Sequence, residues 1–136
     1  MKHPTLAPVI GKIDPANGVG ADSAPQMAKM PWYPRDFASA TRGWPLVARG
    51  AYRELLDAQW DMGSLPDSET EMRTIASATP AEWRICWQYI ERKFPLVVEG
   101  QRRNARLESH RRIALQALAN RQAGAATTNN KRWPKQ

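Results

Sequence analysis

The sequence has few of the residues that build covalent cross-links or metal sites. Among its 136 residues there is one cysteine, Cys86, and there are two histidines, His3 and His110. A single cysteine excludes a disulfide within the chain, and these residues do not have the spacing of a metal site. We therefore expect no metal and no cofactor. We expect Cys86 to be a small buried apolar residue beside Trp83 and Trp87, with a reactive thiol as the alternative.

Long apolar runs are also missing. Residues 1–20 lack the uninterrupted apolar run of a signal peptide, and no stretch of the sequence is long and apolar enough to span a bilayer. The cysteine content gives no sign of an oxidising compartment. We therefore expect a cytoplasmic protein that does not insert into a membrane.

The motifs of common enzyme classes are absent as well. The sequence has no G-x-x-x-x-G-K-[ST] loop, and no Ser, His and acid set stands out. The acidic pair Glu69 and Glu71 follows Ser68, where negative charge suits the positive end of a helix, so it needs no catalytic explanation. We expect that the protein is not an enzyme.

What the chain does have is an uneven excess of positive charge. The net charge is +7, yet residues 1–90 hold 9 Lys and Arg against 10 Asp and Glu, a net of −1. Residues 91–136 hold 11 against 3, a net of +8. A basic C-terminal third indicates a polyanionic partner, and nucleic acid fits better than anionic lipid.

Residues 79–106 read as a helix followed by a β-hairpin. Thr79, Pro80 and Glu82 form a helix-start signal. Apolar residues then recur at helical spacing at Trp83, Trp87, Ile90 and Phe94, and Pro95 ends the helix. Residues 96–98 are β-prone, residues 99–100 can make a two-residue turn, and residues 101–106 read as a polar return strand. A helix followed by an arginine-rich hairpin is typical of a winged helix.

The rest of the chain predicts three more helices and an aromatic arm. The helices span residues 45–62, residues 68–78 and residues 107–122. In the first, Gly50 weakens the helix by about 1 kcal/mol relative to Ala, and a close helix–helix crossing would be a packing reason for it. Residues 31–37 hold two prolines and three aromatics, which favours an extended arm across the core, with a stacking platform for single-stranded bases as the alternative.

These elements predict a mainly α fold with a small β-hairpin, winged-helix-like, in which three helices precede the wing hairpin and one follows it. Residues 1–29 are rich in Pro, Gly and Ala and are expected to form a flexible extension. Residues 30–122 are expected to form the folded domain, and residues 123–136 a basic flexible tail.

Several segments carry a resemblance to a known family. They are residues 32–37 (WYPRDF), 48–57 (ARGAYRELLD) with Trp60, 63–67 (GSLPD), 79–83 (TPAEW) with Phe94, 99–100 (EG) and 104–108 (NARLE). In order and spacing, over residues 31–109, the sequence resembles the YdaU-type family of domains of unknown function, common in phages and prophages. It departs from the family pattern at residues 41–47, which leaves the start of the first helix open. The resemblance implies a fold like the winged-helix part of replication initiators or helicase loaders.

Together with the charge distribution, the expected fold predicts a phage-type DNA-binding protein linked to replication initiation, with duplex DNA as the partner. Arg84, Gln88 and Arg92 would face the major groove, where Arg reads guanine and Gln reads adenine. Phosphate contacts are expected from Arg102, Arg103, Arg106, Arg111 and Arg112. As a strand, residues 101–106 would put Arg102 and Arg106 on one face and Arg103 on the other. The alternative is that these are ordinary exposed charges.

A second function remains open from the residues alone. Ile85 and Tyr89 flank the basic row of the same helix, and apolar residues among charges suit a protein interface. The domain would then be an adaptor that binds a replicative helicase or another replisome protein, without reading a DNA sequence.

Overall fold

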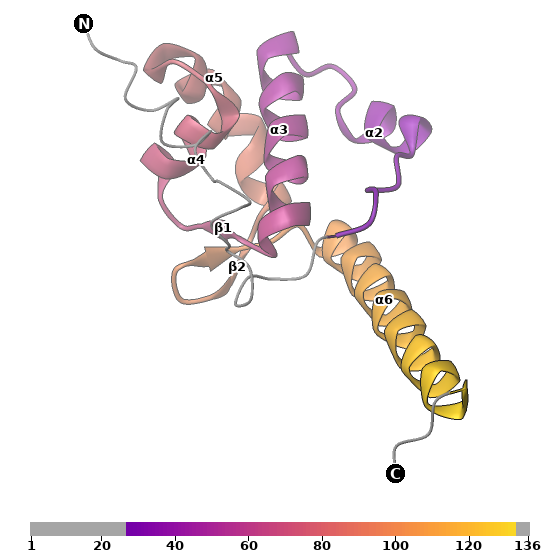
Figure 1. Ribbon diagram of the computed structural model, residues 1–136. Helices are drawn as coiled ribbons and strands as arrows, with labels where there is room; N and C mark the ends of the chain where they lie inside the picture. The colour runs from indigo at the N-terminus through magenta and orange to yellow at the C-terminus, as the bar shows by residue number, and fades with distance from the viewer. Residues whose placement is uncertain (1–26, 133–136) are drawn as a thin grey trace, which may run out of the picture.

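The computed structural model describes residues 27–132, and Figure 1 shows how the elements are arranged. Helix α3 (Leu46–Met62) stands at the centre, with α4 (Glu69–Ala76) and α5 (Pro80–Ile90) on one side of it and α2 (Pro34–Ala40) on the other. Helix α6 (Ala105–Arg132) projects away from this group. A small antiparallel sheet completes the fold, so the prediction of a mainly α chain with a small hairpin is confirmed.

The N-terminal aromatic segment is partly helical, so the prediction of an extended arm is wrong. Pro34 occupies the first position of α2, where its missing N–H removes no helical hydrogen bond. The ring of Phe37 stacks on Tyr52 of α3 with 5.6 Å between centroids. Before α2, the backbone carbonyl of Ala28 accepts a 2.8 Å hydrogen bond from the indole N–H of Trp60. Residues 1–26, most of the predicted extension, lie outside the described residues.

Helix α3 supplies six of the fourteen buried hydrophobic residues of the core and confirms the predicted helix. Its buried residues recur at helical spacing: Ala48, Ala51, Tyr52, Leu55, Leu56, Gln59 and Trp60. The helix ends at Gly63, whose φ of 92° lies in the left-handed region that favours glycine. Among the described residues, no close helix crossing accounts for Gly50, because a Cβ placed there meets nothing within 4 Å.

The two short helices begin as their caps predict. The Ser68 hydroxyl accepts a hydrogen bond from the N–H of Glu71, and α4 starts at Glu69. Thr79 and Glu82 form a reciprocal capping box at the start of α5, with hydrogen bonds of 2.9 and 3.1 Å. After α5 the chain tightens into the 3₁₀ turn η3 (Glu91–Lys93).

The sheet has one strand more than the sequence predicted. Strand β3 (Gln101–Arg102) pairs on one side with β2 (Leu96–Val98) and on the other with β1 (Leu65–Pro66). The predicted return strand over residues 101–106 is therefore too long, because Asn104 already caps α6: its side-chain oxygen accepts from the N–H of Leu107 at 3.0 Å. Arg106 lies on a helix, so Arg102 and Arg106 do not share a strand face.

Helix α6 is longer than predicted at both ends. It spans 28 residues, about 42 Å at the rise of an α-helix, and continues through residues 123–132, which we expected to be a flexible tail. Alanines at 123, 125 and 126 are strong helix formers and offset Gly124. Residues 133–136, with the rest of the predicted tail, lie outside the described residues.

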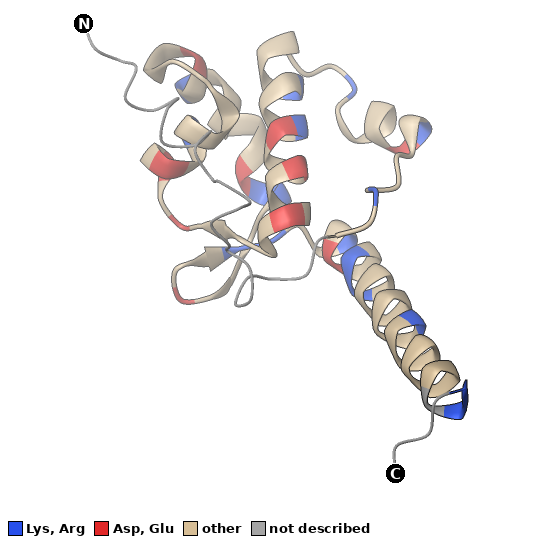
Figure 2. Ribbon diagram, in the orientation of Figure 1, with Lys and Arg blue, Asp and Glu red and all other residues tan. Residues whose placement is uncertain are grey.

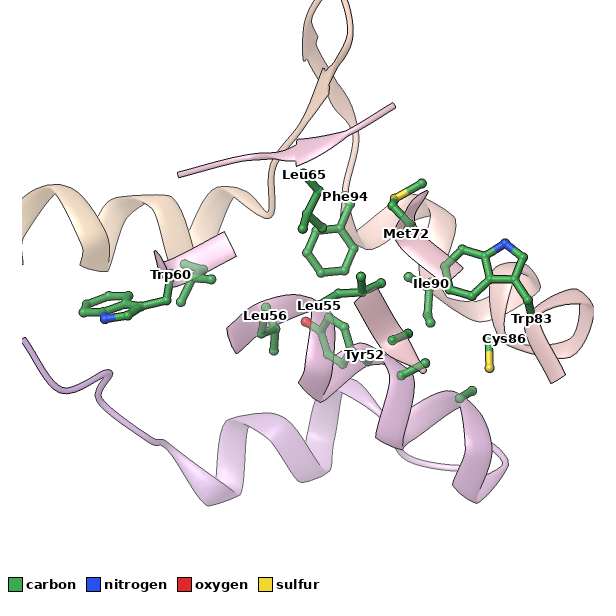
Figure 3. Packing of buried hydrophobic residues seen from close by; sticks show 14 residues of the cluster. Tyr52, Leu55, Leu56, Trp60, Leu65, Met72, Trp83, Cys86, Ile90 and Phe94 are labelled. Atoms are coloured by element: carbon green, nitrogen blue, oxygen red, sulfur yellow. The ribbon is translucent and has the colours of Figure 1, made fainter. Parts of the chain in front are cut away.

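The core lies between α3, α4, α5 and the hairpin (Figure 3). Phe94, Leu55, Leu65, Met72 and Ile90 are fully buried there, and Leu107 at the start of α6 joins the same cluster. Cys86 is fully buried and its thiol donates a 3.4 Å hydrogen bond to the carbonyl of Val47, as expected for a structural cysteine. Burial raises the pKa of the Cys86 thiol, with a further contribution from the Glu82 carboxylate.

Candidate nucleic-acid interface

The predicted recognition row lies on the solvent side of the third core helix. Arg84 and Gln88 are exposed on α5, Arg92 is exposed in η3, and the Gln88 amide donates a 3.2 Å hydrogen bond to the carbonyl of Arg84. Neither arginine takes part in the ion pairs found among residues 27–132. Both guanidinium groups therefore keep their donors for a ligand.

The charge of this face is modest. Residues 80–93 hold three Lys and Arg and two Glu, a net of +1, whereas α6 holds six Lys and Arg and one Glu, a net of +5. Figure 2 shows the basic residues of α6 along a helix that leads away from α5. The basic excess read from the sequence is thus concentrated on α6 more than on the recognition row.

Arg102 holds the hairpin against the body of the domain. Its Nε donates to an Asp67 carboxylate oxygen at 2.8 Å, and its Nη1 donates to the carbonyl of Phe94 at 3.0 Å. The guanidinium also lies 5.2 Å from the ring centroid of Trp87, and the Arg102 side chain is only 13% exposed. These contacts join β3 to the loop before α4 and to the end of α5.

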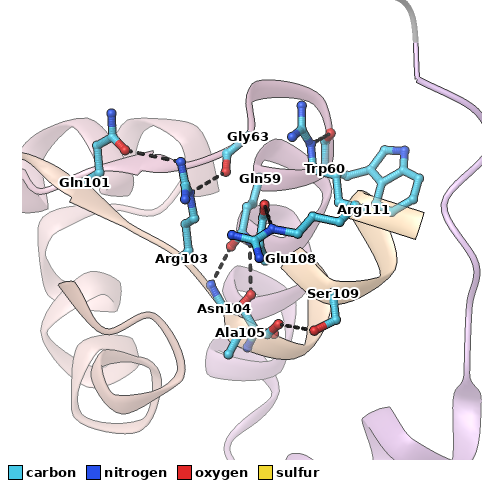
Figure 4. Close-up of polar contacts among 11 residues, drawn as sticks. Gln59, Trp60, Gly63, Gln101, Arg103, Asn104, Ala105, Glu108, Ser109 and Arg111 are labelled. Atoms are coloured by element: carbon cyan, nitrogen blue, oxygen red, sulfur yellow. Dashed lines mark hydrogen bonds and ion pairs between the residues drawn. The ribbon is translucent and has the colours of Figure 1, made fainter. Parts of the chain in front are cut away.

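Arg103 and Arg111 both bind the C-terminal end of α3 (Figure 4). Arg103 donates to the carbonyl of Gly63 at 3.0 Å, and Arg111 donates to the carbonyl of Trp60 at 2.8 Å. The last carbonyls of a helix lack helical partners and carry its negative dipole end, so two guanidinium groups satisfy and stabilise them. Both arginines thereby fix α6 and the hairpin to α3.

Arg106 and Arg112 are paired but remain open to solvent. Arg106 pairs with Asp36 of α2 and lies 5.7 Å from the ring centroid of Tyr33. Arg112 pairs with Glu108 one turn earlier on α6 at 3.1 Å, and its side chain is 72% exposed. Each guanidinium has five N–H donors, so both keep donors for a phosphate.

The eight predicted site residues therefore fall into separate groups and do not form one surface. Arg84, Gln88 and Arg92 stand together on α5 and η3. Arg102, Arg103 and Arg111 serve internal contacts, and Arg106 and Arg112 lie on α6.

Sequence reasoning missed the residue pair that joins the hairpin, α3 and α6. The Gln59 side chain is fully buried; its amide donates to the carbonyl of Asn104 at 3.1 Å, and its oxygen accepts from the N–H of Asn104 at 2.7 Å. The Asn104 amide in turn donates to the carbonyl of Lys93 at 2.9 Å and to the Tyr52 hydroxyl at 3.4 Å. An Asn just before a helical run is a capping signal that the sequence did offer.

The pKa of the Tyr52 hydroxyl is shifted by this buried environment. Desolvation raises the pKa of the Tyr52 hydroxyl above its ordinary value of 10.0, while the hydrogen bond from Asn104 and the charge of Arg106 oppose part of the rise. The phenol therefore stays protonated at neutral pH and acts as a hydrogen-bonding core residue.

Residues 27–132 lack two other kinds of feature. No cluster of three or more His, Cys, Asp or Glu residues that could hold a metal ion occurs in this part of the chain. Within the same residues, no helix combines the length and apolar character needed to cross a membrane.

Comparison with known proteins places the domain in a family. Residues 30–111 match the model of the family described as "Protein of unknown function (DUF1376)". The chain belongs to this family. The DUF1376 match contains α2 to β3 and the first turns of α6, and it ends at Arg111, the residue that anchors α6 to α3. No curated protein and no solved structure matched the chain.

Proposed function

We propose that this DUF1376 domain is a winged-helix domain that binds duplex DNA through α5. The order of elements supports this reading, because α3, β1, α4 and α5 precede the β2–β3 hairpin. The hairpin is joined to the helical part of the domain through β3, which pairs with β1, the strand between α3 and α4. The observation that carries the proposal is the exposed row of Arg84, Gln88 and Arg92, whose charged members have no ion pair among residues 27–132.

The row has the chemistry of base recognition. Arg can contact the O6 and N7 atoms of guanine and Gln the N6 and N7 atoms of adenine, and each good contact contributes about 1–3 kcal/mol of discrimination. An α-helix such as α5 is about 10–12 Å in diameter with its side chains, which suits a major groove about 12 Å wide. In this proposal Arg102, Arg103 and Arg111 hold the hairpin and α6 in place, and Arg112 of α6, 72% exposed, is available to a phosphate.

The cellular role in this proposal follows the resemblance to YdaU-type domains. That resemblance supports a phage or prophage protein that acts in the cytoplasm near replication initiation. Such a role requires DNA contact or contact with a replisome protein, and the two are separable by experiment.

The test is binding to a labelled duplex, measured by fluorescence anisotropy at about 50 and 200 mM salt, a range over which phosphate contacts weaken strongly. The variant Arg84→Ala/Gln88→Ala/Arg92→Ala should bind at least about tenfold more weakly and lose up to about two units of salt slope, if both arginines contact phosphate or base. The control Arg35→Ala/Lys131→Ala removes the same charge from α2 and from the end of α6. Unchanged duplex binding by the triple variant at low salt would contradict the proposal.

A second function has its own observation. Leu96, Val97 and Val98 of β2 are all about half exposed, as is Ile85 on α5, and β2 is an edge strand of the sheet. Large exposed apolar side chains on an edge strand suit a protein partner, such as a replicative helicase. Tyr89, which the sequence placed beside Ile85 on this surface, is instead partly buried against the core, with its ring 5.6 Å from that of Trp44.

The adaptor function predicts a complex that survives high salt. A pull-down with the host replicative helicase should retain the protein at about 500 mM salt, where a Debye length near 4 Å suppresses contacts with DNA phosphates. Val97→Ser/Val98→Ser should abolish that complex and leave duplex binding intact. Retention of the complex by this variant would remove β2 from the interface.

A further inference from the structure

A pocket lies on the other side of α3 from the proposed duplex contacts. Its volume is about 260 Å³, and it opens between the N-terminal segment, α2, α3 and the first turns of α6. Its lining includes Tyr33, Phe37, Tyr52, Lys93, Arg106 and His110. Figure 1 places α2 and α5 on opposite sides of α3, and the pocket lining shares no residue with the row Arg84, Gln88 and Arg92. The volume is below that of pockets for drug-sized ligands, which suits one planar ring system.

The lining of the pocket includes two aromatic rings that are not buried in the core. Trp32 is 42% exposed and Tyr33 is 46% exposed, whereas Phe37, a few residues later in the chain, packs against the core. The Trp32 ring lies 4.9 Å from the Phe37 ring, and the Tyr33 ring lies 5.1 Å from the His110 ring. Exposed aromatic faces beside a pocket are the usual stacking surface for unpaired bases.

Both rings are already paired with cations. The guanidinium of Arg53 lies 4.1 Å from the Trp32 ring centroid, and that of Arg106 lies 5.7 Å from the Tyr33 ring centroid. A planar guanidinium on one side of an exposed ring holds the ring in place and puts a positive charge beside any base stacked there. The acid in the lining is Asp36, which is paired with Arg106.

Positive charge continues from the pocket along α6. At about 100° per residue, Arg106, Arg121 and Arg132 fall within about 80° of one another around the helix. Along the axis they are spaced about 22 and 16 Å apart. Arg112 points about 160° away from this stripe. A strand whose base enters the pocket would therefore find cations for its phosphates along one face of α6.

We propose that the pocket binds an unpaired nucleobase of a single-stranded nucleic acid, stacked on Tyr33 or Trp32, while Arg106, Arg121 and Arg132 contact the phosphates of the strand. The proposal does not depend on duplex binding by α5, because the two faces share no residue. It gives α6, the most basic element of the described chain, a ligand of matching charge.

The experiment measures the anisotropy of a labelled (dT)₂₀ oligonucleotide with the full chain. Trp32→Ala/Tyr33→Ala should weaken binding by about 5- to 100-fold, the range for losing a base stack, while Trp32→Phe/Tyr33→Phe should bind nearly as the wild type because the rings remain. Duplex binding should be unchanged in both variants. The α5 variant Arg84→Ala/Gln88→Ala/Arg92→Ala should show the reverse pattern, so failure of one proposal is distinguishable from failure of the other.

A second pair of variants tests the stripe. Arg121→Ala should lower the salt slope for (dT)₂₀ by about 0.7, the value for one phosphate contact on a single strand, whereas Arg112→Ala should leave it unchanged. Far-ultraviolet circular dichroism confirms that each variant is folded. The assignment fails if wild-type protein does not bind (dT)₂₀ at low salt, or if removing both rings has no effect. Thymidine monophosphate that binds as tightly as (dT)₂₀ would overturn the role of α6.

Discussion

Gln59 is the residue whose replacement tests most directly how the hairpin, α3 and α6 are held together. The change Gln59→Leu keeps a side chain of similar size in a fully buried position and removes both hydrogen bonds to the backbone of Asn104. Leucine offers no donor or acceptor, so the N–H and the carbonyl of Asn104 lose these partners. The carbonyl keeps one bond, from the N–H of Glu108 at 3.0 Å, so the N–H is the group most affected.

The expected loss can be estimated from these bonds. A buried backbone group left without its partner costs about 1–3 kcal/mol. We assign about 2 kcal/mol to the Asn104 N–H, which loses its partner, and about 1 kcal/mol to the Asn104 carbonyl, which keeps one hydrogen bond. The expected loss in the free energy of unfolding is therefore about 3 kcal/mol, a large part of the 5–15 kcal/mol typical for a domain. For a domain of this size that corresponds to a fall in Tm of about 12–24 °C.

Urea unfolding followed by tryptophan fluorescence measures the loss. The control Gln122→Leu makes the same chemical change at an exposed position of α6 and should alter the free energy of unfolding by less than about 0.5 kcal/mol. Gln59→Glu keeps an acceptor for the Asn104 N–H and should lose less stability than Gln59→Leu once the carboxyl is protonated at low pH. A loss below about 1 kcal/mol for Gln59→Leu would refute the view that this pair holds the junction.

Three further changes test local features. Gly50→Ala should raise the free energy of unfolding by about 1 kcal/mol, because alanine favours the helix and nothing lies within 4 Å of the added Cβ. Chemical denaturation would show the gain, and a loss of stability would contradict the open space at this position. Thr79→Ala removes half of the capping box and should cost about 1 kcal/mol in the same assay, with the exposed Thr127→Ala as its control. Since the folded pKa of Tyr52 is raised, its protonated form contributes stability below pH 10 that is lost as the pH rises further. Between about pH 9 and 11, the free energy of unfolding of Tyr52→Phe should therefore fall less with pH than that of the wild type. An equal fall in the two proteins would argue against a buried phenol.

Features encoded within a few residues were predictable from the sequence. The caps at Ser68 and Thr79, the turn at residues 99–100 and the helical end at Gly63 depend on neighbours within about four residues, and the structure has each of them. The predicted buried state of Cys86 belongs to the same group, because its position beside Trp83 on one helical face decided it.

The features that the sequence missed have three different causes. β1 is two residues long and exists because β3 lies beside it, so it has no period of its own in the sequence. Helix α2 was hidden by the assumption that two prolines exclude a helix, although a proline at the first helical position is compatible with one. The end of α6 was placed too early because Gly124 disfavours a helix, while the alanines at 123, 125 and 126 favour one, and these intrinsic propensities differ by only small free energies.

The arginines show most clearly why charge counting cannot define a binding surface. Arg103 and Arg111 are equivalent to Arg84 in a sequence count, yet each donates to a backbone carbonyl at the end of α3, and only the fold brings that helix end to them. Arg102 is likewise held by Asp67, which lies 35 residues earlier in the chain. Because a guanidinium held in this way cannot move to a ligand without leaving a helix end or a carboxylate unpaired, replacing it would lower both stability and binding. Arg84 and Arg121 carry no such internal role among residues 27–132, so a loss of nucleic-acid binding at these two positions, without a loss of stability, would identify true contacts.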